Sequence, residues 1–147
     1  MKIEMALCLP RDAETVAVVR DVAIGALSKL GVREDCVEDI RLALSEACTN
    51  VIDHSGVDDE YEVRLVVEDT KCEMRVIDAG GGLDFTTLGG MPDPMSARGR
   101  GMAIMRAVVD AVKFTSEPES GTMVHLVKQL ELAPDGALAR LVRRSGD

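Results

Sequence analysis

The sequence is poor in aromatic residues and in positive charge. It has no tryptophan, its aromatic residues are Tyr61, Phe85 and Phe114, and its formal net charge is −9. Proteins that bind single-stranded nucleic acids stack bases on aromatic rings, and nucleic-acid-binding domains usually carry a basic patch. The composition therefore argues against direct nucleic-acid binding, and it requires a core of aliphatic side chains.

Long hydrophobic runs and closely paired cysteines are also missing. No apolar run approaches the roughly 18 residues of a membrane-spanning helix, and Glu4 interrupts the N-terminal apolar stretch, which argues against a signal peptide. We therefore expect a cytoplasmic protein without membrane contact. The cysteines form no C-x-x-C pair and each lies in an apolar run, so we interpret them as reduced core thiols: Cys8, Cys36, Cys48 and Cys72.

The chain of 147 residues, 46% of them hydrophobic, has the size of one domain with one core. We assign residues 1–132 to this domain and expect 133–147 to form a flexible C-terminal tail. Alternating apolar residues predict strands, and apolar residues at three- and four-residue spacing predict helices. The expected strands are 3–9, 61–68, 72–77, 112–116 and 122–130, and the expected helices are 12–30, 34–53 and 101–111.

The order of these elements predicts an α+β fold. Because strands follow one another in pairs, we expect a two-layer sandwich with a mixed, mostly antiparallel sheet and helices on one face. The phosphate-binding motif G-x-x-x-x-G-K-[ST] is missing, so another device must hold any bound phosphate. The glycine-rich segment 78–101 is long for a loop in a compact domain, which favours a functional lid over a linker.

Glu46 and Asn50, in E-A-C-T-N, share one face of the second expected helix, one turn apart. One interpretation is a general base, Glu46, beside a Mg²⁺ ligand, the Asn50 amide oxygen. Mg²⁺ prefers oxygen ligands and commonly takes only one or two from the protein. The other interpretation is a solvated polar stripe on a surface helix, and this segment taken alone favours the stripe.

The segment V-I-D-A-G-G-G ends an expected strand with Asp78 and continues into three glycines. Its carboxylate can accept a hydrogen bond from an exocyclic amino group such as that of adenine. Gly80 and Gly82 allow the backbone to approach a ligand closely. An ordinary glycine turn explains the same pattern equally well. Thr122 starts the last expected strand, where its hydroxyl can assist in recognising a base.

The segment R-G-R-G-M, residues 98–102, leads into the third expected helix. Free amides at a helix N-terminus form an anion site, so Gly99 and Gly101 are candidate phosphate contacts. Arg98 or Arg100 can add positive charge to an otherwise acidic chain. Loop glycines before a helix are common, so this segment alone is weak support for a phosphate site.

The ordered set of these segments is more specific than any one of them. E-x-x-x-N, then D-x-G-x-G after a strand, G-x-G before a helix and G-T before a strand resemble the N, G1, G2 and G3 boxes of the GHKL (Bergerat-fold) ATPases. Within them, L-A-L-S-E-A-C-T-N-V-I-D-H-S and G-R-G-M-A-I-M-R-A-V-V-D-A-V are similar to anti-sigma-factor serine/threonine kinases of the RsbW and sporulation type. The resemblance runs from the first strand to about residue 130.

The resemblance implies ATP and Mg²⁺ as ligands and gives each site residue a role. Glu46 would be the base that activates a serine or threonine hydroxyl of an antagonist protein, and Asn50 would bind Mg²⁺. Asp78 would contact adenine, with Thr122 behind it. The glycines would shape the pocket and the lid over the phosphates: Gly80, Gly82, Gly99 and Gly101.

The resemblance also implies partners. Such kinases hold a sigma factor or phosphorylate an anti-anti-sigma (STAS-type) protein, usually as homodimers. The alternative is a catalytically silent binding module of the same fold. In this alternative ATP orders the 83–98 lid segment so that it presents a surface to a partner protein, and no phosphate is transferred. A non-signalling ATPase of the same fold is a third, weaker possibility. The sequence identifies neither the sigma factor nor the antagonist.

Overall fold

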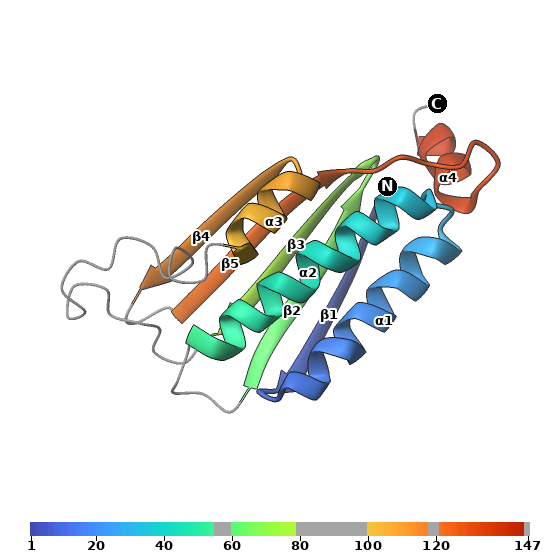
Figure 1. The fold of residues 1–147 in the computed structure, drawn as a ribbon. Coiled ribbons are helices and arrows are strands. Elements are labelled where there is room, and N and C mark those ends of the chain that lie inside the picture. Colours follow the sequence, from blue (N-terminus) through green and yellow to red (C-terminus); the bar gives the residue numbers. More distant parts are fainter. Residues whose placement is uncertain (55–59, 79–99, 118–120, 146–147) are drawn as a thin grey trace.

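The computed structural model describes residues 1–54, 60–78, 100–117 and 121–145 (Figure 1). Within these ranges no helix is long and apolar enough to cross a membrane. The elements follow in the order β1 (Lys2–Pro10), α1 (Ala13–Lys29), α2 (Glu34–His54), β2 (Glu60–Glu68), β3 (Lys71–Asp78), α3 (Arg100–Val108), β4 (Ala111–Glu117), β5 (Gly121–Gln129) and α4 (Ala137–Ser145).

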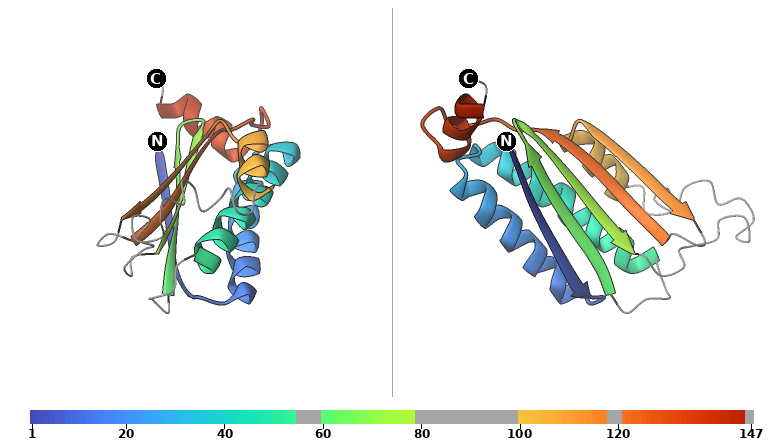
Figure 2. Two further views of the ribbon diagram at one scale, coloured as in Figure 1. Left: turned by 60° about the vertical axis from the view of Figure 1, so that its left-hand side comes forward. Right: turned by 180° about the vertical axis from the view of Figure 1, so that it is seen from behind.

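The strands form one sheet in the order β1-β2-β3-β5-β4, and each neighbouring pair is antiparallel. Helices α1, α2 and α3 cover one face of the sheet, and the other face stays open, as the edge-on view in Figure 2 shows. The predicted two-layer α+β sandwich with helices on one face is therefore confirmed. The order of elements is also as expected up to β5.

Strand periodicity explains how the core forms. In β2, Tyr61, Val63, Leu65 and Val67 are buried, while the residues between them face away from the helices. The matching stripe of α2 is fully buried and aliphatic: Val37, Ile40, Leu44, Ala47 and Val51. The core contains Tyr61 as its one fully buried aromatic side chain in the described part of the chain, in line with the expected aliphatic core.

The ends of α1 follow its sequence signals. The side chain of Asp12 accepts a hydrogen bond from the backbone N–H of Glu14 at 2.9 Å, as expected of an N-cap. Gly31 follows the helix with φ of +83°, a left-handed conformation that favours glycine. These two residues set the length of α1, and the turn after Gly31 places α2 beside it.

The interpretation of all four cysteines as core thiols is wrong for Cys8. Cys36, Cys48 and Cys72 are buried, but Cys8 is exposed. Alternation along β1 turns Leu7 and Leu9 toward the helices and therefore turns Cys8 to the open face. Burial raises the pKa of Cys48 and of Cys72 to about 12.

The structure also differs from the expected flexible tail at residues 133–147. Residues 137–145 form α4, and Leu138 is fully buried. The backbone N–H of Leu138 donates to the carbonyl of Leu30 at 2.8 Å, and that of Ala133 donates to Gly31 at 2.8 Å. Leu138, Leu141 and Val142 recur at the three- and four-residue spacing of a helix, so the sequence does carry a signal for α4. Its docking depends on a turn about 100 residues earlier in the chain, which local pattern does not reveal.

Candidate nucleotide-binding site

Glu46 and Asn50 lie on the face of α2 that meets the start of α3. Gly101 is the second residue of α3, and a Cβ atom added to it would lie 3.0 Å from Asn50 Nδ2 and 3.2 Å from Glu46 Oε2. The start of α3 therefore lies close to both polar side chains, and a side chain at residue 101 would crowd them. The two residues are not a solvated stripe: Glu46 is half-buried and Asn50 is 2% exposed.

The Asn50 amide has an unmet hydrogen-bonding requirement. Its Nδ2 atom is buried and has no hydrogen-bond partner among the described residues. Leaving a buried polar group unpaired costs about 1–3 kcal/mol, so folded proteins nearly always satisfy such groups. The structure thus holds a costly polar side chain beside a carboxylate, which is expected where a ligand completes the hydrogen bonding.

These residues fit a magnesium ion bound together with phosphates. The amide oxygen of Asn50 is a ligand of the kind that Mg²⁺ prefers, and water and phosphate usually provide the remaining ligands. The described residues contain no cluster of three or more His, Cys, Asp or Glu side chains that could hold a metal ion by themselves. The donor set therefore suits a cation that arrives with a nucleotide.

Asp78 and Thr122 form the second part of the site. They end β3 and begin β5, the strand register pairs them directly, and both are fully buried. They lie on the sheet face that the helices cover, because Val76 and Val124 on the same face are buried as well. A buried acceptor next to a buried hydroxyl at the end of two strands can recognise the polar edge of a base.

Arg11 is a site residue that the sequence did not reveal. Its Nη1 atom donates to Asp78 Oδ2 at 2.6 Å, and its Nη2 atom donates to the backbone carbonyls of Val51, at 3.4 Å, and of Ile52. The ion pair joins residues 67 positions apart, so no local motif marks it. The available signal is general: a buried carboxylate needs a cation or several donors nearby.

Several predicted site residues lie outside the described residues. These are Gly80, Gly82, Arg98 and Gly99, together with the 83–98 lid segment. The side chain of Arg100 is also outside that set, although its backbone begins α3. Of the predicted site residues that are described, the structure brings Glu46, Asn50 and Gly101 together at the α2–α3 contact. It brings Asp78 and Thr122 together at the ends of two strands, joined to α2 through Arg11.

His125 belongs to the open face of the sheet and not to this site. It alternates with the buried Val124 and Leu126 on β5, so its ring faces away from the helices. Its Nε2 atom lies 3.9 Å from Glu73 Oε1. Burial, followed by the positive charge of Arg75, lowers the pKa of His125, so the ring is neutral near pH 7.

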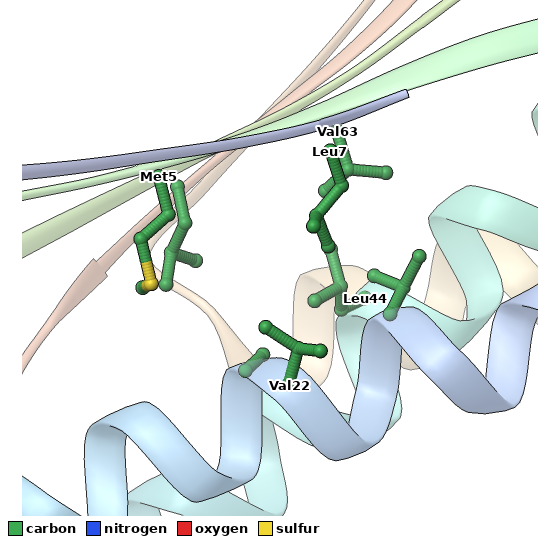
Figure 3. A pocket seen from close by; sticks show the side chains of 8 residues that line it. Met5, Leu7, Val22, Leu44 and Val63 are labelled. Carbon is green, nitrogen blue, oxygen red and sulfur yellow. The ribbon is translucent and has the colours of Figure 1, made fainter. Parts of the chain in front are cut away.

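An apolar crevice on the other side of α2 is a poor alternative site. It lies between the β1–β2 edge of the sheet and α1, and the side chains of Met5, Leu7, Val22, Leu44 and Val63 point into it (Figure 3). Its lining residues are all aliphatic or methionine, so they offer no polar side-chain group to orient a nucleotide.

Comparison with known families agrees with this arrangement. Residues 9–128 match the family model of the histidine kinase-like ATPase domain, which spans the described site from Arg11 to Thr122. The chain belongs to the histidine kinase-like ATPase family. Membership accounts for a nucleotide site on a sheet-and-helix sandwich that lacks the usual phosphate-binding loop.

Relatives and solved structures place this histidine kinase-like ATPase domain more closely. It is 34% identical over 134 residues to the serine-protein kinase RsbW of Bacillus velezensis, which covers 83% of this chain and 82% of the relative. It is 32% identical over 136 residues to RsbW of Bacillus pumilus, covering 83% of each.

Two solved structures share the fold. The structure of the RsbU and RsbW domains of Rv1364c from Mycobacterium tuberculosis matches with a TM-score of 0.68 and 20% identity, over 87% of this chain and 32% of that one. The histidine kinase domain of a blue-light activated kinase from Erythrobacter litoralis matches with a TM-score of 0.52 and 15% identity, over 83% of this chain and 62% of that one.

Proposed function

We propose that this chain is an ATP-dependent serine/threonine protein kinase that regulates a sigma factor by partner switching. The observation that carries the proposal is the close approach of Gly101 to Glu46 and Asn50, which places a carboxylate and an unsatisfied amide at the N-terminus of a helix. The relatives that cover most of this chain are named serine-protein kinases. Both lines support phosphoryl transfer from ATP to a protein hydroxyl.

The site divides into an adenine half and a chemical half. In the adenine half, Asp78 accepts a hydrogen bond from the adenine amino group and Thr122 lies beside it, with Gly80 and Gly82 shaping the pocket. In the chemical half, the amides at the start of α3, with Gly99 and Gly101, face the phosphates, and Arg98 and Arg100 add charge. The position of Asp78 at the end of β3, of Thr122 near the start of β5 and of Gly101 in the first turn of α3 supports this division.

Glu46 acts as the general base. It takes the proton of a serine or threonine hydroxyl as that oxygen bonds to the γ-phosphorus, and the bond from phosphorus to the β–γ bridging oxygen breaks to release ADP. Asn50 is placed to ligate Mg²⁺ through its amide oxygen. When bound, Mg²⁺ neutralises charge on the phosphates. Most of the rate enhancement then comes from positioning, since phosphoryl transfer requires little covalent chemistry from the protein.

The family resemblance names the partners. The phosphoryl acceptor is an anti-anti-sigma protein of the STAS type, and the competing ligand is a sigma factor. The kinase works as a homodimer in the cytoplasm. None of these assignments depends on direct contact with nucleic acid, in keeping with the acidic, aromatic-poor composition.

The test is Glu46→Gln, which keeps the size of the side chain and one acceptor oxygen but removes its charge and basicity. We expect transfer of labelled phosphate from ATP to the antagonist to fall by about 10²–10⁴-fold, the usual contribution of a general base. ATP binding, measured by calorimetry, is expected to stay within about threefold of wild type, because Glu46 lies in the chemical half.

Glu38→Gln is the matched control. Glu38 lies on the same helix, is exposed, and pairs with Arg41 at 2.9 Å. A surface pair of this kind contributes little, so transfer should be unchanged. Full transfer by Glu46→Gln would refute the assignment of the base. ATP-dependent binding of the partner without any transfer by the wild-type chain would show a silent, ATP-gated binding module instead.

A further inference from the structure

Arg11 is a largely buried cation that bonds to Asp78 of the candidate site and to the C-terminal end of α2. It lies between the end of β1 and the N-cap of α1, and its side chain is only 11% exposed. Arginine is almost never buried unless it is paired. Here its guanidinium reaches the strand end that carries Asp78 and the last turn of the helix that carries Glu46 and Asn50.

The ion pair with Arg11 favours the charged form of Asp78. This carboxyl is fully buried, and burial alone favours its neutral, protonated form. A guanidinium at 2.6 Å favours the ionised form and adds a charge-assisted hydrogen bond. The bond involves Oδ2, and a carboxylate has about four lone-pair positions. Pairing with Arg11 is therefore compatible with accepting a further hydrogen bond from a ligand.

The second set of partners fixes the end of α2. The carbonyl groups in the last turn of a helix receive no hydrogen bond from an N–H group of the same helix, and they form the negative end of the helix dipole. Arg11 donates to two of them, at Val51 and Ile52, with the same guanidinium that holds Asp78. One side chain thus ties the adenine half of the site to the helix of the chemical half.

We propose that Arg11 is a positioning residue that sets the selectivity of Asp78 for adenine. An ionised carboxylate only accepts hydrogen bonds, so it pairs with the 6-amino group of adenine and repels the 6-oxo group of hypoxanthine or guanine in the same pose. A protonated Asp78 would donate to that oxo group and lose the discrimination. The inference rests on the proposed function, because it takes ATP as the ligand.

The experiment compares ATP with inosine triphosphate, which differs in having a 6-oxo group in place of the 6-amino group. Affinities of the full chain for both nucleotides are measured by calorimetry with Mg²⁺ at pH 8 and pH 6. The variants are Arg11→Gln, which can still donate a hydrogen bond but has no charge, and Arg11→Lys, which keeps the charge. Circular dichroism melting establishes that each variant is folded, since breaking a buried pair is destabilising.

Arg64→Met is the matched control. Arg64 pairs with Glu62 at the same distance of 2.6 Å, but on the open face, where its side chain is 52% exposed. Because exposed pairs contribute little, both nucleotide affinities should equal those of wild type. The control separates loss of an arginine from loss of the arginine beside Asp78.

We expect wild type to prefer ATP by tenfold or more, as sites built to bind an N–H group do, with the same preference at both pH values. Arg11→Gln should narrow the preference about tenfold, and more at pH 6 than at pH 8, because the positive charge that favours the ionised carboxylate is removed. Arg11→Lys should retain it. In an Asp78→Asn background, Arg11→Gln should have no additional effect on the preference.

Several results would overturn the inference. These are a preference unchanged in Arg11→Gln, equal weakening of both nucleotides, tighter ATP binding in that variant, or loss of the preference in Arg11→Lys. The wild-type protein provides a further test that needs no mutation. If its preference for ATP over inosine triphosphate falls from pH 8 to pH 6, Asp78 is not held in its ionised form. Wild type that binds neither nucleotide would refute the proposed function as well. ATP binding that depends on Asp78 but not on Arg11 would refute this inference alone.

Discussion

Replacing Gly101 with alanine perturbs the candidate site by one methyl group. The new Cβ atom would lie 3.0 Å from Asn50 Nδ2 and 3.2 Å from Glu46 Oε2, which is closer than ordinary van der Waals contact. Both neighbours are side-chain ends, so they can move by a few tenths of an ångström. The methyl group therefore displaces the two polar groups of the chemical half while the α3 backbone stays in place.

The effect on stability should be small because two terms oppose each other. Overpacking costs about 1–3 kcal/mol in a well-packed core, and the lower part of that range applies where flexible side chains yield. Alanine in place of glycine in a helix gains up to about 1 kcal/mol, partly by restricting the unfolded chain. We expect a net change in the free energy of unfolding within about 1 kcal/mol.

The effect on phosphoryl transfer should be much larger. A misplacement of about 1 Å can cost about 10²-fold in rate, so a shift of a few tenths predicts a loss of about tenfold. The assay is transfer of labelled phosphate from ATP to the antagonist, measured beside thermal unfolding. Gly25→Ala, in the interior of α1, is the control, because a Cβ there meets no atom within 4 Å. It should raise stability and leave transfer unchanged.

Wild-type transfer by Gly101→Ala would refute the geometry on which the proposed function depends. So would a loss of transfer that merely follows a loss of folded protein in the unfolding measurement.

Two further predictions concern stability and thiol chemistry. Leu138→Ala should lower the free energy of unfolding, measured in urea, by about 2–5 kcal/mol because Leu138 is fully buried. The exposed control Arg144→Ala should change it by less than about 0.5 kcal/mol. An equally small change for Leu138→Ala would show that the tail is not docked. Alkylation of the folded chain at pH 8 should modify Cys8 first, with the buried thiols reacting only after unfolding. Because folding raises the pKa of Cys48 and Cys72 from 9.0 to about 12, their contribution to stability is complete below pH 9 and is lost as the pH rises from 9 toward 12, which urea unfolding at several pH values would detect.

Much of the fold could be predicted because it depends on local pattern. The aliphatic alternation of β2 and β3 and the stripe of α2 specify which face of each element is buried, and the pairing of strands follows from their succession. The tail was predicted incorrectly because α4 depends on one buried leucine and on the close approach of Gly136 to Gly31, where a Cβ on Gly136 would lie 3.0 Å from Gly31 Cα. Cys8 was misplaced because its apolar run was read as a sign of burial, although the alternation of β1 assigns Cys8 to the face opposite Leu7 and Leu9.

The candidate residues of the site could be identified from local pattern, since the spacing of Glu46 and Asn50 and the strand that ends in Asp78 are local properties of the chain. How these residues meet depends on the packing of the helices on the sheet. The Nδ2 atom of Asn50 is buried without a hydrogen-bond partner among the described residues, Gly101 approaches Asn50 and Glu46 so closely that an added Cβ atom would crowd both, and Arg11 joins Asp78 to the end of α2. These residues are far apart in the sequence, so no local periodicity predicts that they meet. Packing the helices on the sheet buries charged groups, and a buried charge is stable only when it is paired with another group.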